Sequence, residues 1–156
     1  HASKRCGSDV RDVALTVPSI PHRIKVPGVV EVHGELHTFD ANNPQASQKA
    51  AARALNHHVS SDGLVFTAYR VVEPTGNEAG TLDFLRKLGF YTPDTLVCTY
   101  PQQIKQLYQE WLDGQRFSSY PTDGIVVKVY DHDLQRKMGV SNGEKPCPFW
   151  ALALKR

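Results

Sequence analysis

Residues 29–39 carry the feature that most limits the fold, because apolar or small side chains alternate there with polar ones. A period of two places the two sets on opposite faces of an extended strand. The segment therefore predicts a strand with one face suited to a core and one polar face. The first set is Val30, Val32, Gly34, Leu36 and Thr38, and the polar set is Glu31, His33, Glu35 and His37.

Further strands and helices follow from residue type and from helix start and stop signals. Beta-branched and aromatic residues predict strands over 64–72, 124–130 and 149–154. Helices are predicted over 43–57, 81–89 and 99–114, begun by Asn43–Pro44, by Thr81 and by Thr99 respectively. The last helix has an apolar stripe with helical spacing, formed by Ile104, Leu107, Tyr108, Trp111 and Leu112. Residues 4–28 predict an irregular or short-stranded entry, and residues 131–139 a polar connection.

The order of these elements could fit a parallel doubly wound sheet, but no phosphate-binding loop supports that fold. Neither GxGxxG nor GxxxxGK[ST] follows any predicted strand. We therefore expect an α+β domain with mixed or antiparallel sheets and flanking helices. A chain of 156 residues is long enough for one core. Residues 1–3 are expected to be a tag or cloning remnant, and residues 4–156 the domain itself.

Charge and cysteine content exclude several classes of protein. Eighteen basic and sixteen acidic residues leave a formal charge of +2, so charge alone does not indicate nucleic acid as a partner. Three widely spaced cysteines fit neither a disulfide framework nor a CxxC metal site, and no apolar run could span a membrane. We expect a cytoplasmic protein. The histidines lack zinc-site spacing and are expected at the surface or at a pocket edge; they include His33, His37, His57, His58 and His132.

Four charged residues lie within or beside otherwise apolar strands, namely Glu35, Asp123, Lys128 and Lys155. Two carboxylates and two lysines that converge from strands would suit a site for phosphate and a metal ion. The simpler interpretation from the pattern alone is that each residue lies on the solvated face of its strand.

Three segments resemble motifs of the adenylation domain of NAD-dependent DNA ligases. Residues 30–36 resemble the third nucleotidyltransferase motif, with His33 in place of its arginine. Residues 123–128, Asp-Gly-Ile-Val-Val-Lys, are similar to the fourth motif, and residues 148–155 resemble the fifth, with Phe149 where arginine is usual. Each motif alone is a weak signal, but their order and approximate spacing also agree. The resemblance covers almost the whole chain and implies a nucleotidyltransferase-like fold.

The resemblance also implies roles for individual residues. Residues 64–69 resemble the aromatic strand whose tyrosine stacks on adenine, which gives that role to Tyr69; from pattern alone it could equally be a core tyrosine. Arg116 matches an arginine upstream of the fourth motif that binds phosphate or the nicotinamide ribose. The helix after Asn43 departs from the family, since Gln45 replaces an arginine.

In this family a lysine in a Lys-x-Asp-Gly motif attacks the α-phosphate of NAD and carries AMP, which is nucleophilic catalysis. By resemblance, Lys128 and Lys155 would contact phosphate, and Glu35 would lie near the ribose or Mg²⁺. Asp123 would hold the metal or tune the lysine. NAD and Mg²⁺ are thus the implied cofactors, and nicked DNA is the implied partner in the full-length context.

The nucleophilic lysine is absent, because both Asp-Gly pairs, at 62–63 and 123–124, lack a lysine two residues before the aspartate. The expected function is part of a ligase adenylation domain for nick sealing in DNA repair and replication. It would not adenylate itself alone, because the motif lies upstream in the family or comes from a second chain. The alternatives are a non-catalytic module that binds nucleotide or DNA, and a scaffold with a vestigial site.

Overall fold

The computed structural model describes the chain except residues 1–6, 8, 40–43, 58–62, 121 and 144–145. The described residues form five helices and four strands in mixed order. The helices are α1 (Arg11–Ala14), α2 (Pro44–His57), α3 (Glu78–Lys87), α4 (Pro101–Leu112) and α5 (His132–Met138). The strands are β1 (Val32–Thr38), β2 (Leu64–Val71), β3 (Gly124–Lys128) and β4 (Ala151–Lys155).

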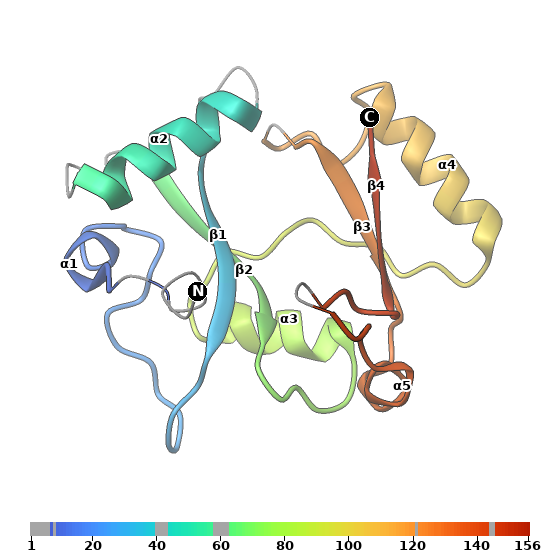
Figure 1. Cartoon of the computed structure of the whole chain (residues 1–156), viewed down its shortest axis with the longest axis horizontal. Coiled ribbons are helices and arrows are strands. Elements are labelled where there is room, and N and C mark those ends of the chain that lie inside the picture. Colours follow the sequence, from blue (N-terminus) through green and yellow to red (C-terminus); the bar gives the residue numbers. More distant parts are fainter. Residues whose placement is uncertain (1–6, 8, 40–43, 58–62, 121, 144–145) are drawn as a thin grey trace.

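The strands form two separate antiparallel pairs, β1 with β2 and β3 with β4. In Figure 1 the two pairs stand side by side, with α2 on the outer side of the first and α4 on the outer side of the second. Helices α3 and α5 lie together at one end. This arrangement confirms the expected α+β class with antiparallel sheets and flanking helices.

Two apolar clusters fix the β1–β2 pair to its helices. The first joins Val13 of α1, Ala51 and Ala54 of α2, and Leu64 of β2, all buried. The second joins Ala68 of β2 to Leu82 and Leu85 of α3. Both clusters use the same face of β2, because residues 64 and 68 are an even number of positions apart. The opposite face of this sheet is therefore directed away from α2 and α3.

Helix α3 begins earlier than its sequence predicts. Asn77 rather than Thr81 is the N-cap, and its side-chain oxygen accepts a hydrogen bond from the N–H of Gly80 at 2.9 Å. Thr81 is instead buried within the helix. The prediction was wrong because Asn and Thr are both good caps, and the packing of Thr81 into the protein decided between them.

Helix α4 agrees closely with the prediction, since Trp111 is buried and Gly114 has φ 71° just beyond the end. Its cap differs: Tyr100 occupies the N-cap position in place of Thr99. The side-chain oxygen of Gln103 accepts hydrogen bonds from the N–H groups of both Thr99 and Tyr100. The predicted cap of α2, Asn43, lies outside the described residues.

Two short helices were not predicted. Helix α1 occupies part of the segment expected to be irregular or short-stranded, and α5 occupies the predicted polar connection. The side chain of Asp131 caps α5 by accepting from the N–H of Leu134 at 2.8 Å. The predicted strands begin and end at the observed residues or within three residues of them. No helix among the described residues is long and apolar enough to cross a membrane.

Candidate functional site

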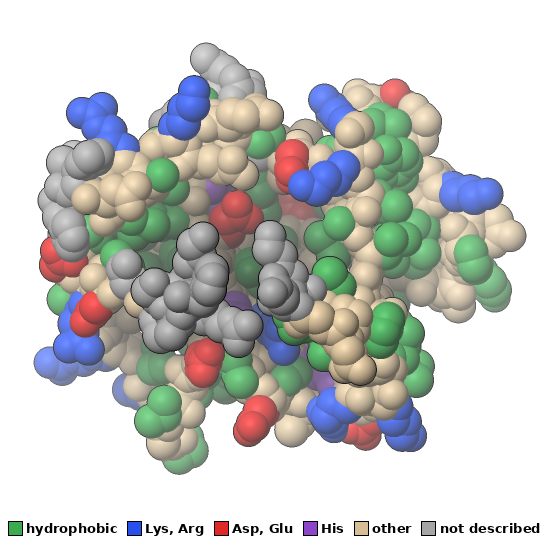
Figure 2. All heavy atoms as spheres, in the orientation of Figure 1, with side chains coloured by type: hydrophobic (Ala, Val, Ile, Leu, Met, Phe, Trp, Pro, Cys, Tyr) green, Lys and Arg blue, Asp and Glu red, His purple; other side chains and the backbone are tan. Residues whose placement is uncertain are grey.

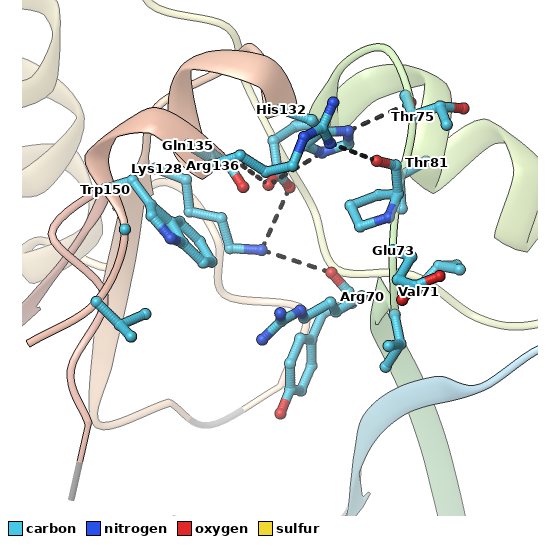
Figure 3. Close-up of a pocket in the computed structure, with 16 residues that line it drawn as sticks. Arg70, Val71, Glu73, Thr75, Thr81, Lys128, His132, Gln135, Arg136 and Trp150 are labelled. Atoms are coloured by element: carbon cyan, nitrogen blue, oxygen red, sulfur yellow. Dashed lines mark hydrogen bonds and ion pairs between the residues drawn. The ribbon is translucent and has the colours of Figure 1, made fainter.

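A cavity of about 680 Å³ opens between the end of β2 and the helices α3 and α5. Tyr69 and Lys128 line it, and they are the two predicted site residues that the structure brings together there. The rest of the wall comes from β2 and the loop after it, from α3, from α5 and the residues that follow it, and from Trp150 just before β4. Figure 3 shows Lys128 extending into this space, with the Trp150 ring on one side of it. We call this cavity the pocket.

Lys128 is the last residue of β3, and its ammonium group is held on three sides. Its Nζ lies 3.2 Å from Oε2 of Glu78 and 3.5 Å from the carbonyl oxygen of Tyr69. The same atom lies 5.8 Å from the centroid of the Tyr69 ring. An ammonium group over an aromatic face is attracted by the negative face of the ring. Lys128 therefore contacts the residue expected to stack on adenine.

Glu35 lies on the face of the β1–β2 sheet opposite to the apolar clusters, where it is paired directly with Thr67. Tyr69 follows Thr67 by two residues and has no partner on β1, because Gly34 pairs with Ala68 and His33 with Arg70. Tyr69 is thus the extra residue of a β-bulge, which interrupts the alternation of faces. The Glu35 side chain is exposed, and 39% of the Tyr69 surface remains accessible. The sheet therefore carries an accessible carboxylate and an accessible aromatic ring next to this bulge.

Asp123 and Lys155 form a second, separate pair at the other end of the β3–β4 sheet. The Lys155 ammonium donates to Oδ2 of Asp123 at 2.8 Å, and both side chains are more than half exposed. The hydrogen bond from Lys155 lowers the pKa of Asp123, and the same contact raises the pKa of Lys155. Solvent screening makes such an exposed pair weak. Both groups are therefore available to a ligand.

The register of β3 and β4 sets the separation of the two lysines. Gly124 is paired with Lys155 and Lys128 with Ala151, so both lysines lie on one face, four residue positions apart. At the usual rise of a strand this corresponds to about 13 Å. The two lysines, both expected to contact phosphate, are therefore carried at opposite ends of the β3–β4 pair.

Arg116 lies after the end of α4, and no described contact joins it to the other predicted site residues. Its Nε donates to Oε2 of Glu110 at 2.7 Å, and nearly half of its side chain is exposed. The hydrogen bond from Arg116, with a second from Gln106, lowers the pKa of Glu110.

The predicted metal ligands do not form a ready-made site. Within the described part of the chain, no group of three or more His, Cys, Asp or Glu residues could hold a metal ion. Glu35 is on the β1–β2 sheet, whereas Asp123 is next to β3 and is engaged by Lys155. The described protein residues alone therefore do not fit a Mg²⁺ cage.

His37 is buried, which corrects the expectation that it lies at the surface or at a pocket edge, whereas His33 is exposed as expected. His132 lines the pocket, in line with the expectation of a pocket-edge residue, and keeps only 2% of its surface accessible. His37 lies on the face of Glu35, with Nε2 2.7 Å from the hydroxyl of Thr67. Its ring stacks on Tyr120 at 4.6 Å between centroids.

Burial of His37 should make the protein less stable in mild acid. Burial lowers the pKa of His37 below its ordinary 6.5, and the nearby Thr38 backbone and Glu35 carboxylate offset part of that effect. Below about pH 6.5 the unfolded chain binds a proton that the native ring does not, so the free energy of unfolding falls. We expect urea unfolding at about pH 8 and about pH 5.5 to show this fall, and His37→Phe to reduce it. An equal fall in the variant would assign the pH dependence to other groups.

The residues of the pocket wall that sequence reasoning did not name as site residues include Glu78, His132 and Gln135. All three lie in or next to helices whose start was misplaced or not predicted. Asp131 as a cap and Gly139 as a stop were available signals for α5. Their convergence on Lys128, however, depends on contacts between residues about fifty positions apart.

Comparison with known proteins gives one consistent family. The family model described as the NAD-dependent DNA ligase adenylation domain matches residues 3–156. The chain is 34% identical over 96% of its length to a protein named DNA ligase from Thermotoga maritima, of which it covers 25%. It is 31% identical over 96% to the DNA ligase of Roseobacter denitrificans, covering 24% of it. It is 33% identical over 94% of its length to the DNA ligase of Herpetosiphon aurantiacus, of which it covers 24%. The chain thus spans about a quarter of the length of these curated relatives.

Proposed function

Because this chain belongs to the family of NAD-dependent DNA ligase adenylation domains, we propose that the pocket and the adjoining sheet faces bind the adenylate half of NAD. The observation that carries this proposal is the position of the Lys128 ammonium, 5.8 Å from the centroid of the Tyr69 ring within one cavity. An aromatic face with a hydrogen-bond donor beside it suits a flat heteroaromatic base.

The proposed arrangement places the base and the phosphate at different ends of the site. Adenine stacks on Tyr69, and Lys128 donates a hydrogen bond to it. Glu35 is paired with Thr67, two residues before Tyr69 in β2, and its carboxylate can accept from the ribose hydroxyls. Lys155 lies about 13 Å from Lys128 along β4 and neutralises the phosphate after leaving Asp123. The nucleotidyltransferase-like fold is part of the same proposal.

The chain's own residues would bind and orient the nucleotide rather than attack it. Lys-x-Asp-Gly does not occur in residues 1–156, so the nucleophile must be supplied outside this sequence. Asp123 then holds Lys155 in place until a phosphate arrives. Arg116 is exposed and can exchange Glu110 for a phosphate or for the nicotinamide ribose. Mg²⁺, when bound, would supply charge neutralisation at the phosphates.

Nicked DNA is the proposed substrate of a complete ligase that contains this domain, in DNA replication and repair. The relatives named DNA ligase support this part of the proposal. The face shown in Figure 2 intersperses Lys and Arg with Asp and Glu, in line with the formal charge of +2. A formal charge of this size is far from the basic excess that dominates DNA affinity. We therefore assign nucleotide binding to this chain and place most DNA affinity elsewhere in the ligase.

Transfer of labelled adenylate tests the proposed function. The chain is mixed with Mg²⁺ and NAD labelled in its α-phosphate, with and without a polypeptide that carries Lys-x-Asp-Gly, supplied in trans or fused. We expect covalent label on the lysine of the added polypeptide only when this chain and that polypeptide are both present. The Lys155→Ala variant of this chain should give much less label. A catalytic role would be contradicted if no label appeared with the polypeptide supplied in trans or with the polypeptide fused to the chain. If AMP still binds, the chain is instead a nucleotide-binding module, the alternative favoured by the missing lysine.

A further inference from the structure

We infer that Glu78 is a positioning residue that holds the Lys128 ammonium against Tyr69, an inference that rests on the proposed function. Glu78 is the first residue of α3 and was not among the predicted site residues. Its two carboxylate oxygens are shared between different elements: Oε2 accepts from Lys128 of β3 at 3.2 Å, and Oε1 accepts from Gln135 of α5 at 2.7 Å. The carboxylate thus connects the β3 lysine to two helices.

The carboxylate of Glu78 is itself held from several sides. Gln135 is buried, and its amide also donates to the carbonyl of Val129 at 2.6 Å, next to Lys128. Nε2 of the buried His132 lies 3.5 Å from Oε1 of Glu78, and Nδ1 lies 3.2 Å from the carbonyl of Thr75. These contacts leave the carboxylate little freedom to choose another orientation.

The backbone at Glu78 is fixed as well. Its N–H donates to the carbonyl of Tyr130 at 3.0 Å, and the N–H of His132 donates to the carbonyl of Gly76 at 3.1 Å. Between these two bonds, Asn77 and Asp131 form an antiparallel bridge. The starts of α3 and α5 are therefore joined directly, and the Glu78 carboxylate is carried on a rigid junction.

This junction makes the two lysines of the proposed site different. Lys128 and Glu78 keep only 24% and 19% of their side chains exposed, whereas Lys155 and Asp123 keep 64% and 58%. Burial strengthens the first pair and makes an unpaired charge there costly. Two of the three ammonium N–H donors of Lys128 are directed at Glu78 and Tyr69, which leaves one for a ligand. The ammonium group of Lys128 is thus held in place before a ligand binds, whereas that of Lys155 can leave Asp123 for a ligand.

Glu78→Gln tests the role, because glutamine keeps the shape and removes the charge. Binding of adenosine and of AMP is followed by the fluorescence of Trp150, which lines the pocket. The matched control is Asp83→Asn, which removes an exposed carboxylate from the same helix outside the pocket wall. We expect both ligands to bind about fivefold to tenfold more weakly to Glu78→Gln. In Asp83→Asn both dissociation constants should stay within about twofold of the wild-type values.

A purely structural role of Glu78 would lower the melting temperature of the variant but would leave the ammonium group of Lys128 unchanged. A ¹⁵N-resolved ammonium signal of Lys128, assigned by its loss in Lys128→Arg, reports whether hydrogen bonds protect that group from exchange with water. We expect the signal in the wild type and in Asp83→Asn, and not in Glu78→Gln. Its absence from the wild type would overturn the inference even if Glu78→Gln failed to fold.

The outcomes separate the two proposals. If the wild type binds both ligands and Glu78→Gln binds them with the same affinities, the positioning role is overturned and the proposed function stands. Tighter binding of AMP with unchanged binding of adenosine also overturns the positioning role, because Glu78 would then act by repelling phosphate. No binding of either ligand to the wild type overturns the proposed function itself.

Discussion

Lys128→Ala is expected to weaken the binding of AMP about a hundredfold, or roughly 3 kcal/mol. The variant removes a charged donor from the pocket and leaves the Glu78 carboxylate, only 19% exposed, without its cation. An unpaired carboxylate would also repel an anionic ligand. Isothermal titration of the wild type and the variant with AMP measures the difference.

The matched control for this loss is Lys137→Ala. Lys137 is exposed on α5 and does not line the pocket, so its substitution removes the same charge at a site away from the ligand. Its dissociation constant for AMP should stay within about twofold of the wild-type value. Combining Lys128→Ala with Glu78→Gln should cost less than the sum of the two single effects, because the two side chains are in contact. A loss of similar size in Lys137→Ala would mean that net charge, rather than the position of Lys128, determines binding.

Gly34→Ala is expected to lower the free energy of unfolding by about 3 kcal/mol, near the top of the range for overpacked sites. A Cβ atom at this position would lie 2.3 Å from Cζ of Phe66 and 2.6 Å from the carbonyl oxygen of Thr67. The Phe66 ring packs against the cluster between β2 and α3, so it cannot simply rotate away. The backbone of β2 must therefore move, next to a point where the ladder register already shifts between His33 and Gly34. Urea unfolding of the wild type and the variant measures the change in the free energy of unfolding, provided that its dependence on urea concentration has the same slope in both.

Gly143→Ala provides the comparison, because a Cβ atom there meets no atom within 4 Å. It should change the free energy of unfolding by less than about 1 kcal/mol. Gly34→Ala should also weaken AMP binding, since Glu35 is the next residue and its position depends on the same ladder. A stability of Gly34→Ala equal to that of the wild type would show that the two strands are further apart than described.

The elements predicted best from sequence are those whose signal is local. The alternation around Glu35 and the helical stripe that ends at Trp111 both gave the correct type of element, because one buried face imposes one period. The same alternation placed His37 in the polar set, yet it is buried. Tyr120, more than eighty positions further along the chain, stacks on its ring, and no local pattern carries that contact.

Candidate site residues were found through motif resemblance, but their grouping came only with the structure. Six residues were expected to act together. The structure puts two in the pocket, pairs two others at the far end of β3–β4, leaves Arg116 with Glu110 and keeps Glu35 on β1. Sheet register determined this division, since Lys128 and Lys155 are four positions apart on one face. Glu78 had no motif to identify it, because its role depends on the junction of α3 and α5.

Mapping the AMP contact by NMR tests the central claim most directly. Backbone ¹H–¹⁵N spectra of the wild-type chain are recorded with AMP added to about millimolar concentration. A nucleotide site between the two sheets predicts the largest shifts around Tyr69 and Lys128, with a second group at Glu35 and at Lys155. The outer face of α2 should remain unchanged. The absence of any shift, or shifts confined to α4 or to the outer face of α2, would contradict a nucleotide site at this position.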